Sequence, residues 1–212
     1  SYQRSINSIK REFFKNEIFP IELTNKKGSI IIENDEEPLK FNKERTISLK
    51  PAFEKLGTIT AANASSLNDG AAAVLLCSKD KVKKLNLVPK AKIISHISVA
   101  TDPVYFTKAP VKAIEALIKQ SGVSIEEIDL FEINEAFSCV TMYAINKLGI
   151  SIDKVNILGG AVSLGHPIGA SGARILVTLL NALKIKNKKY GIAAICIGGG
   201  EASAMLIERI DE

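Results

Sequence analysis

Residues 155–208, VNILGGAVSLGHPIGASGARILVTLLNALKIKNKKYGIAAICIGGGEASAMLIE, carry the pattern that decides the fold. A short apolar segment at 155–158 is followed, after Pro167, by a helical periodicity, and two further apolar segments at 192–197 and 202–208 flank three glycines. Strands that alternate with helices are typical of layered α/β domains. The stretch therefore predicts an α/β fold. The helix face expected to point inward consists of Gly172, Leu176, Leu179 and Leu183.

The same alternation extends towards the N-terminus. Residues 129–133 predict a short strand and residues 136–148 a helix, while residues 91–100 predict a strand and Pro110 the start of a helix. Residues 71–78 form an almost continuous apolar run. Such a run indicates a strand that is buried on both faces.

The N-terminal quarter of the chain has a different character. Residues 4–14 predict an amphipathic helix, and residues 18–23 and 29–32 predict two strands joined by a hairpin turn at 26–28. Residues 33–57 are polar and show no period. A segment of that length without its own periodicity indicates a long surface excursion, which is more often functional than idle.

Composition narrows the classes of function. The chain has 212 residues, of which 46% are hydrophobic, and a formal net charge of +5. Its lysines lack interleaved aromatic residues, which indicates solvated surface or a face for an anionic ligand and argues against nucleic acid. No apolar run reaches ~18 residues, so we expect no membrane span. Three cysteines without metal-ligand spacing argue for a reducing, intracellular compartment and against disulfides or a zinc site. The first residues show neither a signal-peptide nor a transit-peptide pattern.

His166 is a candidate catalytic base. It lies between a glycine-rich turn and the helix that follows Pro167. The positive end of a helix dipole disfavours a protonated imidazole, so this histidine is suited to accept a proton near neutral pH. The alternative is a histidine that only caps the helix. The second histidine, His96, falls inside a strand pattern and is expected to be structural.

Cys196 is a second candidate, because residues 198–200 after it are all glycine. Consecutive glycines are entropically costly and make sense where bare N–H groups must approach a ligand and stabilise an oxyanion. The alternative is a small buried packing residue. Cys77 and Cys139 have no such setting and are expected to pack inside a strand and a helix. Asn134, at a strand-to-helix junction, is suited to hold a water or a carbonyl oxygen, or else to cap the helix.

Taken together, these segments resemble the thiolase family. Residues 134–137 match its NEAF motif, residues 159–174 resemble GGAxxxGHPxGxSGxR, and residues 196–200 resemble CxGGG. Upstream, residues 57–73 are similar to the family segment that contacts coenzyme A. The resemblance covers essentially the whole chain.

The resemblance implies a fold and an activity. The chain would be the C-terminal half of a layered α/β fold. Residues 58–212 would form a mixed five-stranded sheet with helices on both faces, and residues 1–57 a remnant of an inserted loop domain. The implied reaction interconverts two acyl-CoA molecules with a 3-ketoacyl-CoA and free coenzyme A, without a cofactor. Residues 106–111 and 161–164 are similar to mitochondrial-type members that act on acetoacetyl-CoA, so acetyl-CoA is the expected acyl-CoA.

Four residues receive catalytic roles from the resemblance. His166 would activate a nucleophilic cysteine and help to bind a thioester oxyanion, and Asn134 would hold the water that completes this oxyanion hole. Cys196 would move the proton at the substrate α-carbon or on departing coenzyme A. Gly198 would offer its N–H to a second oxyanion hole.

Binding roles follow from the same resemblance. Ser65 matches a coenzyme A contact, and Lys40 and Arg45 match basic positions near its phosphates. The related members also bind potassium, and backbone carbonyls suit such a hard cation. The positions that match its ligands are Tyr2, Ala61, Ala62, Ala64 and Val162.

One departure from the family pattern affects the activity. The nucleophilic cysteine of the family lies in a CASG-like motif of its N-terminal half, and none of the three cysteines here sits in such a motif. We therefore expect that the N-terminal half is missing, that it is the natural partner, and that this chain is inactive alone. The full protein would be a homodimer or tetramer in the mitochondrial matrix or cytoplasm. The alternatives are a longer-chain 3-ketoacyl-CoA thiolase and a non-catalytic module that binds acyl-CoA or lipid.

Overall fold

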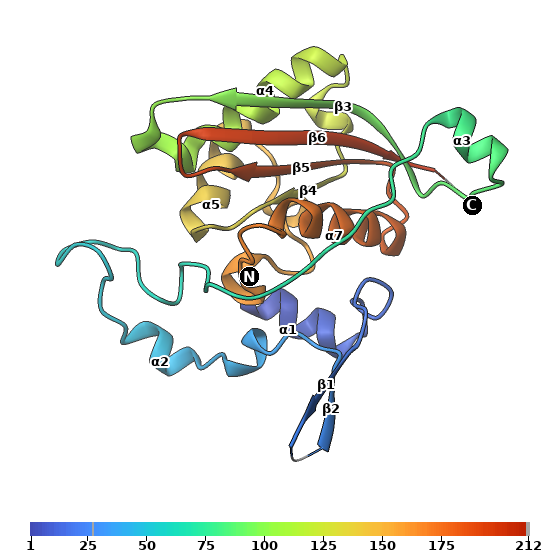
Figure 1. The fold of residues 1–212 in the computed structure, drawn as a ribbon. Helices are drawn as coiled ribbons and strands as arrows, with labels where there is room; N and C mark the ends of the chain where they lie inside the picture. Colours follow the sequence, from blue (N-terminus) through green and yellow to red (C-terminus); the bar gives the residue numbers. More distant parts are fainter. Residues whose placement is uncertain (27, 211–212) are drawn as a thin grey trace.

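A computed structural model describes residues 1–26 and 28–210. Its centre is a four-stranded sheet with the order β3-β6-β5-β4, shown in Figure 1. The edge strand β3 (Ala91–Ala100) pairs antiparallel with β6 (Glu201–Arg209), which pairs antiparallel with β5 (Tyr190–Cys196). β5 in turn pairs parallel with β4 (Leu130–Ile133). The α/β class and the mixed sheet predicted from the sequence are therefore confirmed.

Helices cover both faces of this sheet. On one face α4 (Ala109–Ser121) packs on β3, β6 and β5, with α5 (Ser138–Leu148) beside it, and on the other α7 (Ser171–Ile185) packs on β4 and β5 (Figure 1). Each side has its own buried apolar cluster. Of the helix face expected to point inward from α7, Leu179 and Leu183 are fully buried.

Glycines end two of these helices. α4 ends at Gly122 with φ +74° and α5 ends at Gly149 with φ +64°. Only glycine adopts this left-handed conformation without cost. Short 3₁₀ helices make the remaining connections: η2 (Pro103–Lys108), η3 (Ile125–Glu127) and η4 (Ile152–Lys154).

The N-terminal segments lie along the edge that carries the loop before α7. α1 (Tyr2–Lys10) packs against the short helix α6 (Ala161–Leu164), and Phe14 is buried beside α7. A hairpin of β1 (Ile21–Asn25) and β2 (Gly28–Ile32) follows. Lys27, in the predicted turn, lies outside the described residues. The surface excursion contains only η1 (Glu37–Lys40) and α2 (Lys43–Ile47).

Two predicted strands are absent from the described residues. Residues 71–78 run as an extended, exposed segment before α3 (Lys79–Lys84), with Leu75 82% and Leu76 69% exposed, so Cys77 is exposed as well. An apolar run indicates burial, but here no neighbouring strand covers it. Residues 155–158 form only an isolated bridge between Phe131 and Val155, which leaves four strands in the described sheet rather than five. No helix in the described ranges is long and apolar enough to cross a membrane.

This contrast predicts uneven hydrogen exchange. Amides of residues 71–78 donate no backbone hydrogen bond within the described part of the chain, whereas β5 and β6 are paired along their length. Exchange of 71–78 is therefore expected to be complete in seconds, while β5 and β6 stay protected for hours. Mass spectrometry of peptic peptides measures this directly. Equal protection of both regions would show that the segment pairs with another strand in solution.

Candidate active site

Two of the four candidate catalytic residues meet at one edge of the sheet. Asn134 follows β4 directly, and its N–H donates to the carbonyl of Ala194 in β5 at 2.9 Å. His166 comes from the loop between α6 and α7. The Asn134 Nδ2 and His166 Nε2 atoms are 3.3 Å apart. The parallel pairing of β4 and β5 and the return of the chain before α7 thus join residues that are 32 positions apart.

The surroundings of His166 define which ring nitrogen carries the proton. The Ser171 hydroxyl donates to the carbonyl of Pro167 at 3.0 Å, so its oxygen is available to accept. His166 Nδ1 lies 2.6 Å from that oxygen. Nδ1 therefore carries the proton, and Nε2 keeps a lone pair that faces Asn134. The backbone is held too, since His166 N–H donates to the carbonyl of Ser66 at 2.9 Å.

The electrostatics of the edge favour a neutral histidine. Burial lowers the pKa of His166 below its ordinary value, and the positive charge of Arg174 lowers it further. Asn134 is 1% exposed, and its Oδ1 accepts from Arg174 Nη2 at 3.4 Å. A neutral imidazole with a free Nε2, next to an oriented amide, can take a proton from a thiol and then donate to an oxyanion.

Cys196 lies at the carboxyl end of β5, beside β4, but its side chain is 8% exposed and packs in the apolar cluster on the α4 and α5 side. Burial raises the pKa of its thiol, so it stays protonated near neutral pH. No hydrogen bond joins Cys196 to Asn134 or His166 among the described residues. That the thiol shares a pocket with His166 stays a prediction.

Gly198 lies in the tight turn between β5 and β6. The turn is closed by hydrogen bonds from Ile197 N–H to Glu201 O, 2.8 Å, and from Gly200 N–H to Ile197 O, 3.0 Å. Within the described chain the Gly198 N–H donates no backbone hydrogen bond, and the residue is exposed. That this N–H binds an oxyanion stays a prediction.

Glu135 holds several segments together at the same edge. The sequence placed it in the NEAF motif but gave no sign of this structural role. Its carboxylate accepts from Ser1 Oγ at 2.8 Å, Asn156 Nδ2 at 3.0 Å and the backbone N–H of Val162 at 3.1 Å. A Cβ at Gly160 would lie 2.3 Å from its Cδ atom, so glycine is required there. Glu135 thereby ties α1, the end of β4 and α6 together.

The residues expected to bind coenzyme A are separated. Ser65 lies next to the site, because its N–H and its hydroxyl both donate to the carbonyl of Ala136, at 3.1 and 3.0 Å. Lys40 and Arg45 are exposed on η1 and α2, and Lys40 forms an ion pair with Glu37. Of these three residues, only Ser65 forms a hydrogen bond to the NEAF segment in the described part of the chain.

The positions expected to bind potassium fall into two groups. Tyr2 and Val162 lie on α1 and α6, which pack together, and the ring of Tyr2 stacks on Phe41 with centroids 4.6 Å apart. Ala61, Ala62 and Ala64 lie in or beside a turn, with Ala64 bridged to Phe137. The ligands would be backbone carbonyls, so the side chains at these positions neither support nor contradict a potassium site. Among described residues, no group of three His, Cys, Asp or Glu side chains could hold a metal.

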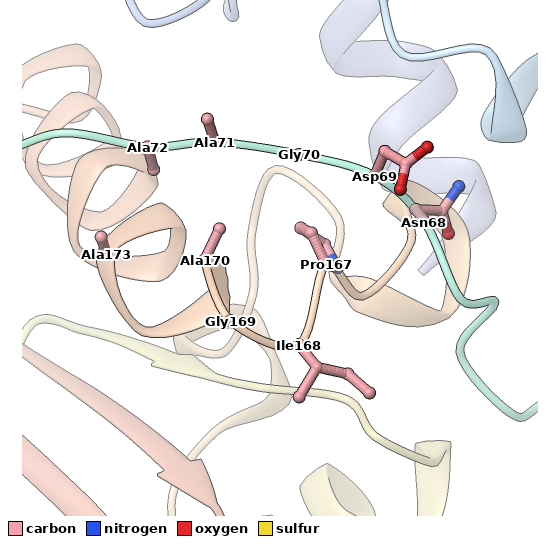
Figure 2. Close-up of a pocket in the computed structure, with 10 residues that line it drawn as sticks. All are labelled: Asn68, Asp69, Gly70, Ala71, Ala72, Pro167, Ile168, Gly169, Ala170 and Ala173. Carbon is pink, nitrogen blue, oxygen red and sulfur yellow. The ribbon is translucent and has the colours of Figure 1, made fainter.

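An open cavity of about 410 Å³ lies at Pro167, the residue after His166 (Figure 2). Its walls are residues 68–72 on one side and residues 167–170 with Ala173 on the other. The side chains of Ala170 and Ala173 point towards the extended segment, whereas Ile168 points away (Figure 2). A Cβ at Gly70 would lie 2.8 Å from Pro167. The start of the exposed segment, at Gly70, therefore packs closely against Pro167 in the loop that carries His166.

Comparison with known proteins agrees with these motifs. The family model for the C-terminal domain of thiolase matches residues 87–209, and that for the N-terminal domain matches residues 1–80. The chain is 50% identical over 210 residues to an acetyl-CoA acetyltransferase of Yarrowia lipolytica, covering 99% of this chain and 52% of the relative. A probable acetyl-CoA acetyltransferase of Dictyostelium discoideum is 45% identical, with 99% and 51% covered.

Solved structures show the same likeness. The crystal structure of the Bacillus anthracis acetyl-CoA acetyltransferase superposes with a TM-score of 0.96 at 38% identity, covering 99% of this chain and 54% of that one. Human mitochondrial 3-ketoacyl-CoA thiolase superposes with a TM-score of 0.91 at 38% identity, with 99% and 53% covered. The thiolase-like fold expected from the motifs is therefore confirmed.

The matches also define how much of the family the chain represents. It spans about half the length of the curated relatives it matches. The match of residues 1–80 to the N-terminal-domain model does not support the expectation that the N-terminal half is missing as a whole. One family model covers more than half of the chain and agrees with the paired Asn134 and His166 at the edge of an α/β sheet. The chain belongs to the thiolase family.

Proposed function

We propose that this chain works in an acetyl-CoA acetyltransferase, which interconverts two acetyl-CoA with acetoacetyl-CoA and coenzyme A. The observation that carries the proposal is the contact of 3.3 Å between Asn134 Nδ2 and the unprotonated Nε2 of His166. A module that only binds acyl-CoA needs no neutral histidine base beside an oriented amide. The names of relatives at 45–50% identity support the choice of acetyl-CoA.

The geometry suggests how protons move in this reaction. His166 Nε2 takes the proton of an attacking cysteine thiol, and the resulting N–H, with a donor held by Asn134, stabilises the thioester oxyanion. Cys196, whose thiol stays protonated, can give its proton to departing coenzyme A and, as thiolate, take one from the acetyl α-carbon. Gly198 N–H then stabilises the enolate oxygen, a contribution typically of about 3 kcal/mol for one such donor.

The nucleophilic cysteine is proposed to come from thiolase polypeptide beyond this chain. Cys77 is exposed, Cys139 lies on α5 and Cys196 is buried, and none of them follows the expected motif. Residues 71–78 leave an apolar edge uncovered next to the cavity at Ala170 and Ala173. This surface would receive the polypeptide that carries the nucleophile, so purified chain alone is expected to show no thiolysis.

A chimera tests the function. In the Yarrowia lipolytica acetyl-CoA acetyltransferase, the 210-residue matched segment is replaced by residues 1–212. Thiolysis by coenzyme A is then followed as the loss of acetoacetyl-CoA absorbance. We expect turnover in the chimera, and a loss of at least about 10³-fold on replacing His166 by alanine. The matched control is His96→Ala, because the side chain of His96 is exposed on β3, and this variant should keep the activity of the parent chimera.

The outcomes separate the alternatives. A folded chimera that cleaves only longer 3-ketoacyl-CoA substrates would favour a 3-ketoacyl-CoA thiolase, the name printed for one of the similar structures. A folded chimera that binds acetyl-CoA but shows no turnover with any chain length would contradict the catalytic proposal and favour a binding module.

Four further expectations stay proposals. Ser65, Lys40 and Arg45 would contact coenzyme A, and a potassium ion would bind to the backbone near Ala62 and Val162. The complete protein would be a homodimer or tetramer in the mitochondrial matrix or cytoplasm. The structural boundary near residue 57 would separate the surface excursion at residues 33–57 from the segment in which Ser65 bonds to the NEAF segment.

A further inference from the structure

Arg174 occupies a position that helix stability does not explain. It lies in the first turn of α7, where the helix dipole disfavours a positive charge. Its side chain is only 18% exposed, and its Nε and Nη1 atoms are buried without a hydrogen-bond partner among the described residues. Burial of a guanidinium with unpaired donors is costly. Its placement therefore calls for a compensating role.

The contacts of Arg174 point to Asn134 and to one buried carboxyl group. Its Nη2 donates to Asn134 Oδ1 at 3.4 Å, and its Nη1 lies 3.7 Å from Glu132 Oε2. Glu132 is 2% exposed on β4, two residues before Asn134. With its oxygen on the guanidinium, the carboxamide of Asn134 must present its nitrogen to His166. The opposite orientation would place an amide NH₂ against a cation.

We propose that Arg174 is a positioning residue of this site, which fixes the direction of the Asn134 amide and keeps a positive charge behind His166, while Glu132 anchors the guanidinium. The role rests on the proposed acyltransferase function, because only there do the amide and imidazole act on a substrate. Arg174 itself contacts neither His166 nor any reacting atom, so it acts through Asn134 and through its charge.

The charged groups around Arg174 leave part of its charge uncompensated. Glu17, Asp35 and Glu132 all interact with it, and burial raises the pKa of each of these carboxyl groups, to about 6 for Glu17 and about 8 for Glu132. Arg4 and Glu135 also act on Glu132. Near neutral pH, Glu132 therefore keeps its proton in a large fraction of molecules. Burial lowers the pKa of His166, and the positive charge of Arg174 lowers it further.

Nuclear magnetic resonance of the chain tests the role without any turnover. Only two histidines are present, so ¹⁵N-labelled imidazoles give two titration curves, and exposed His96 on β3 serves as an internal reference. We expect Arg174→Met to raise the His166 midpoint by about 0.5–1 pH unit and to leave His96 unchanged. The nitrogen shifts should also show the Nδ1–H tautomer in the parent chain and a mixture in the variant.

Two more variants complete the test. Arg174→Lys keeps the positive charge but loses the planar guanidinium that holds the Asn134 oxygen. The midpoint of His166 should therefore move by less than half of the shift in Arg174→Met, while the tautomer becomes mixed. Arg11→Met removes an exposed arginine that lies over the ring of Phe13, and should change neither readout. An unchanged midpoint and tautomer in both Arg174 variants, or an equal change in Arg11→Met, would overturn the proposal. An inactive chimera with these shifts intact would instead count against the acyltransferase function alone.

Discussion

Replacement of Gly200 by alanine is expected to lower the free energy of unfolding by about 3 kcal/mol or more. Gly200 has φ +95°, a conformation that L side chains rarely adopt. A Cβ there would lie 2.4 Å from Thr101 O and 2.9 Å from Pro103 N. Both are backbone atoms that cannot turn aside, and Thr101 N–H also donates to Gly200 O at 2.9 Å. The variant would therefore separate the turn of β5 and β6 from the end of β3.

The matched control lies two residues earlier in the same glycine run. A Cβ at Gly198 meets no atom within 4 Å, and its φ lies outside the left-handed range. Gly198→Ala should therefore change the free energy of unfolding by less than about 1 kcal/mol. Urea denaturation followed by circular dichroism compares the two. Equal losses in both variants would mean that glycine is required along the whole run for flexibility rather than at Gly200 for space.

The second large effect concerns the pH dependence of stability, and it arises from Glu132. Burial raises the pKa of this carboxyl group from 4.5 to about 8 in the folded chain, against the opposing charge of Arg174. Between these values the folded state holds a proton that the unfolded chain has released. Stability due to Glu132 is therefore fully present below pH 4.5 and is lost as the pH rises to about 8. Glu17, with a pKa of about 6, adds a smaller loss in the same direction.

Glu132→Gln isolates this contribution. The parent chain should lose about 2–4 kcal/mol of unfolding free energy between pH 5 and pH 8.5, and the glutamine variant much less, so that the variant is the more stable of the two at pH 8.5. Glu115→Gln, on the exposed face of α4, is the control and should follow the parent. Urea denaturation at the two pH values measures both. A parent whose stability rises with pH would show that Glu132 is ionised, and firmly paired with Arg174, throughout.

The elements that could be predicted from the sequence are those whose partners lie within this chain. β3, β5 and β6 coincide with their apolar runs to within a residue or two, because each pairs with a neighbouring strand and packs against α4 or α7. The strand predicted at residues 71–78 was wrong. An apolar run shows that burial is favourable, but it does not show which segment covers it. Residues 155–158 failed because Asn156, with φ +46°, breaks the extended conformation after one bridge.

The candidate site divides in the same way. Asn134 and His166 were found because glycine-rich turns and strand ends mark their positions locally. Arg174 and Glu132 were missed, because their contact joins a helix to a strand over 42 positions. The only local signal was a positive charge in the first turn of α7, which opposes the helix dipole. Such a charge is a useful reason to search for a buried partner in a sequence of this kind.

The uncovered run at 71–78 has a consequence for the chain in a cell. Short, extended, uncharged segments rich in aliphatic residues can add edge to edge to copies of themselves, and they are typical seeds of aggregation. Val74, Leu75 and Leu76 are exposed in a row, and the first charges follow only at Lys79 and Asp80. We therefore expect the soluble yield of the chain to fall with its concentration during synthesis. Chaperones that hold apolar segments, or polypeptide that covers this edge, would then set how much of the protein accumulates.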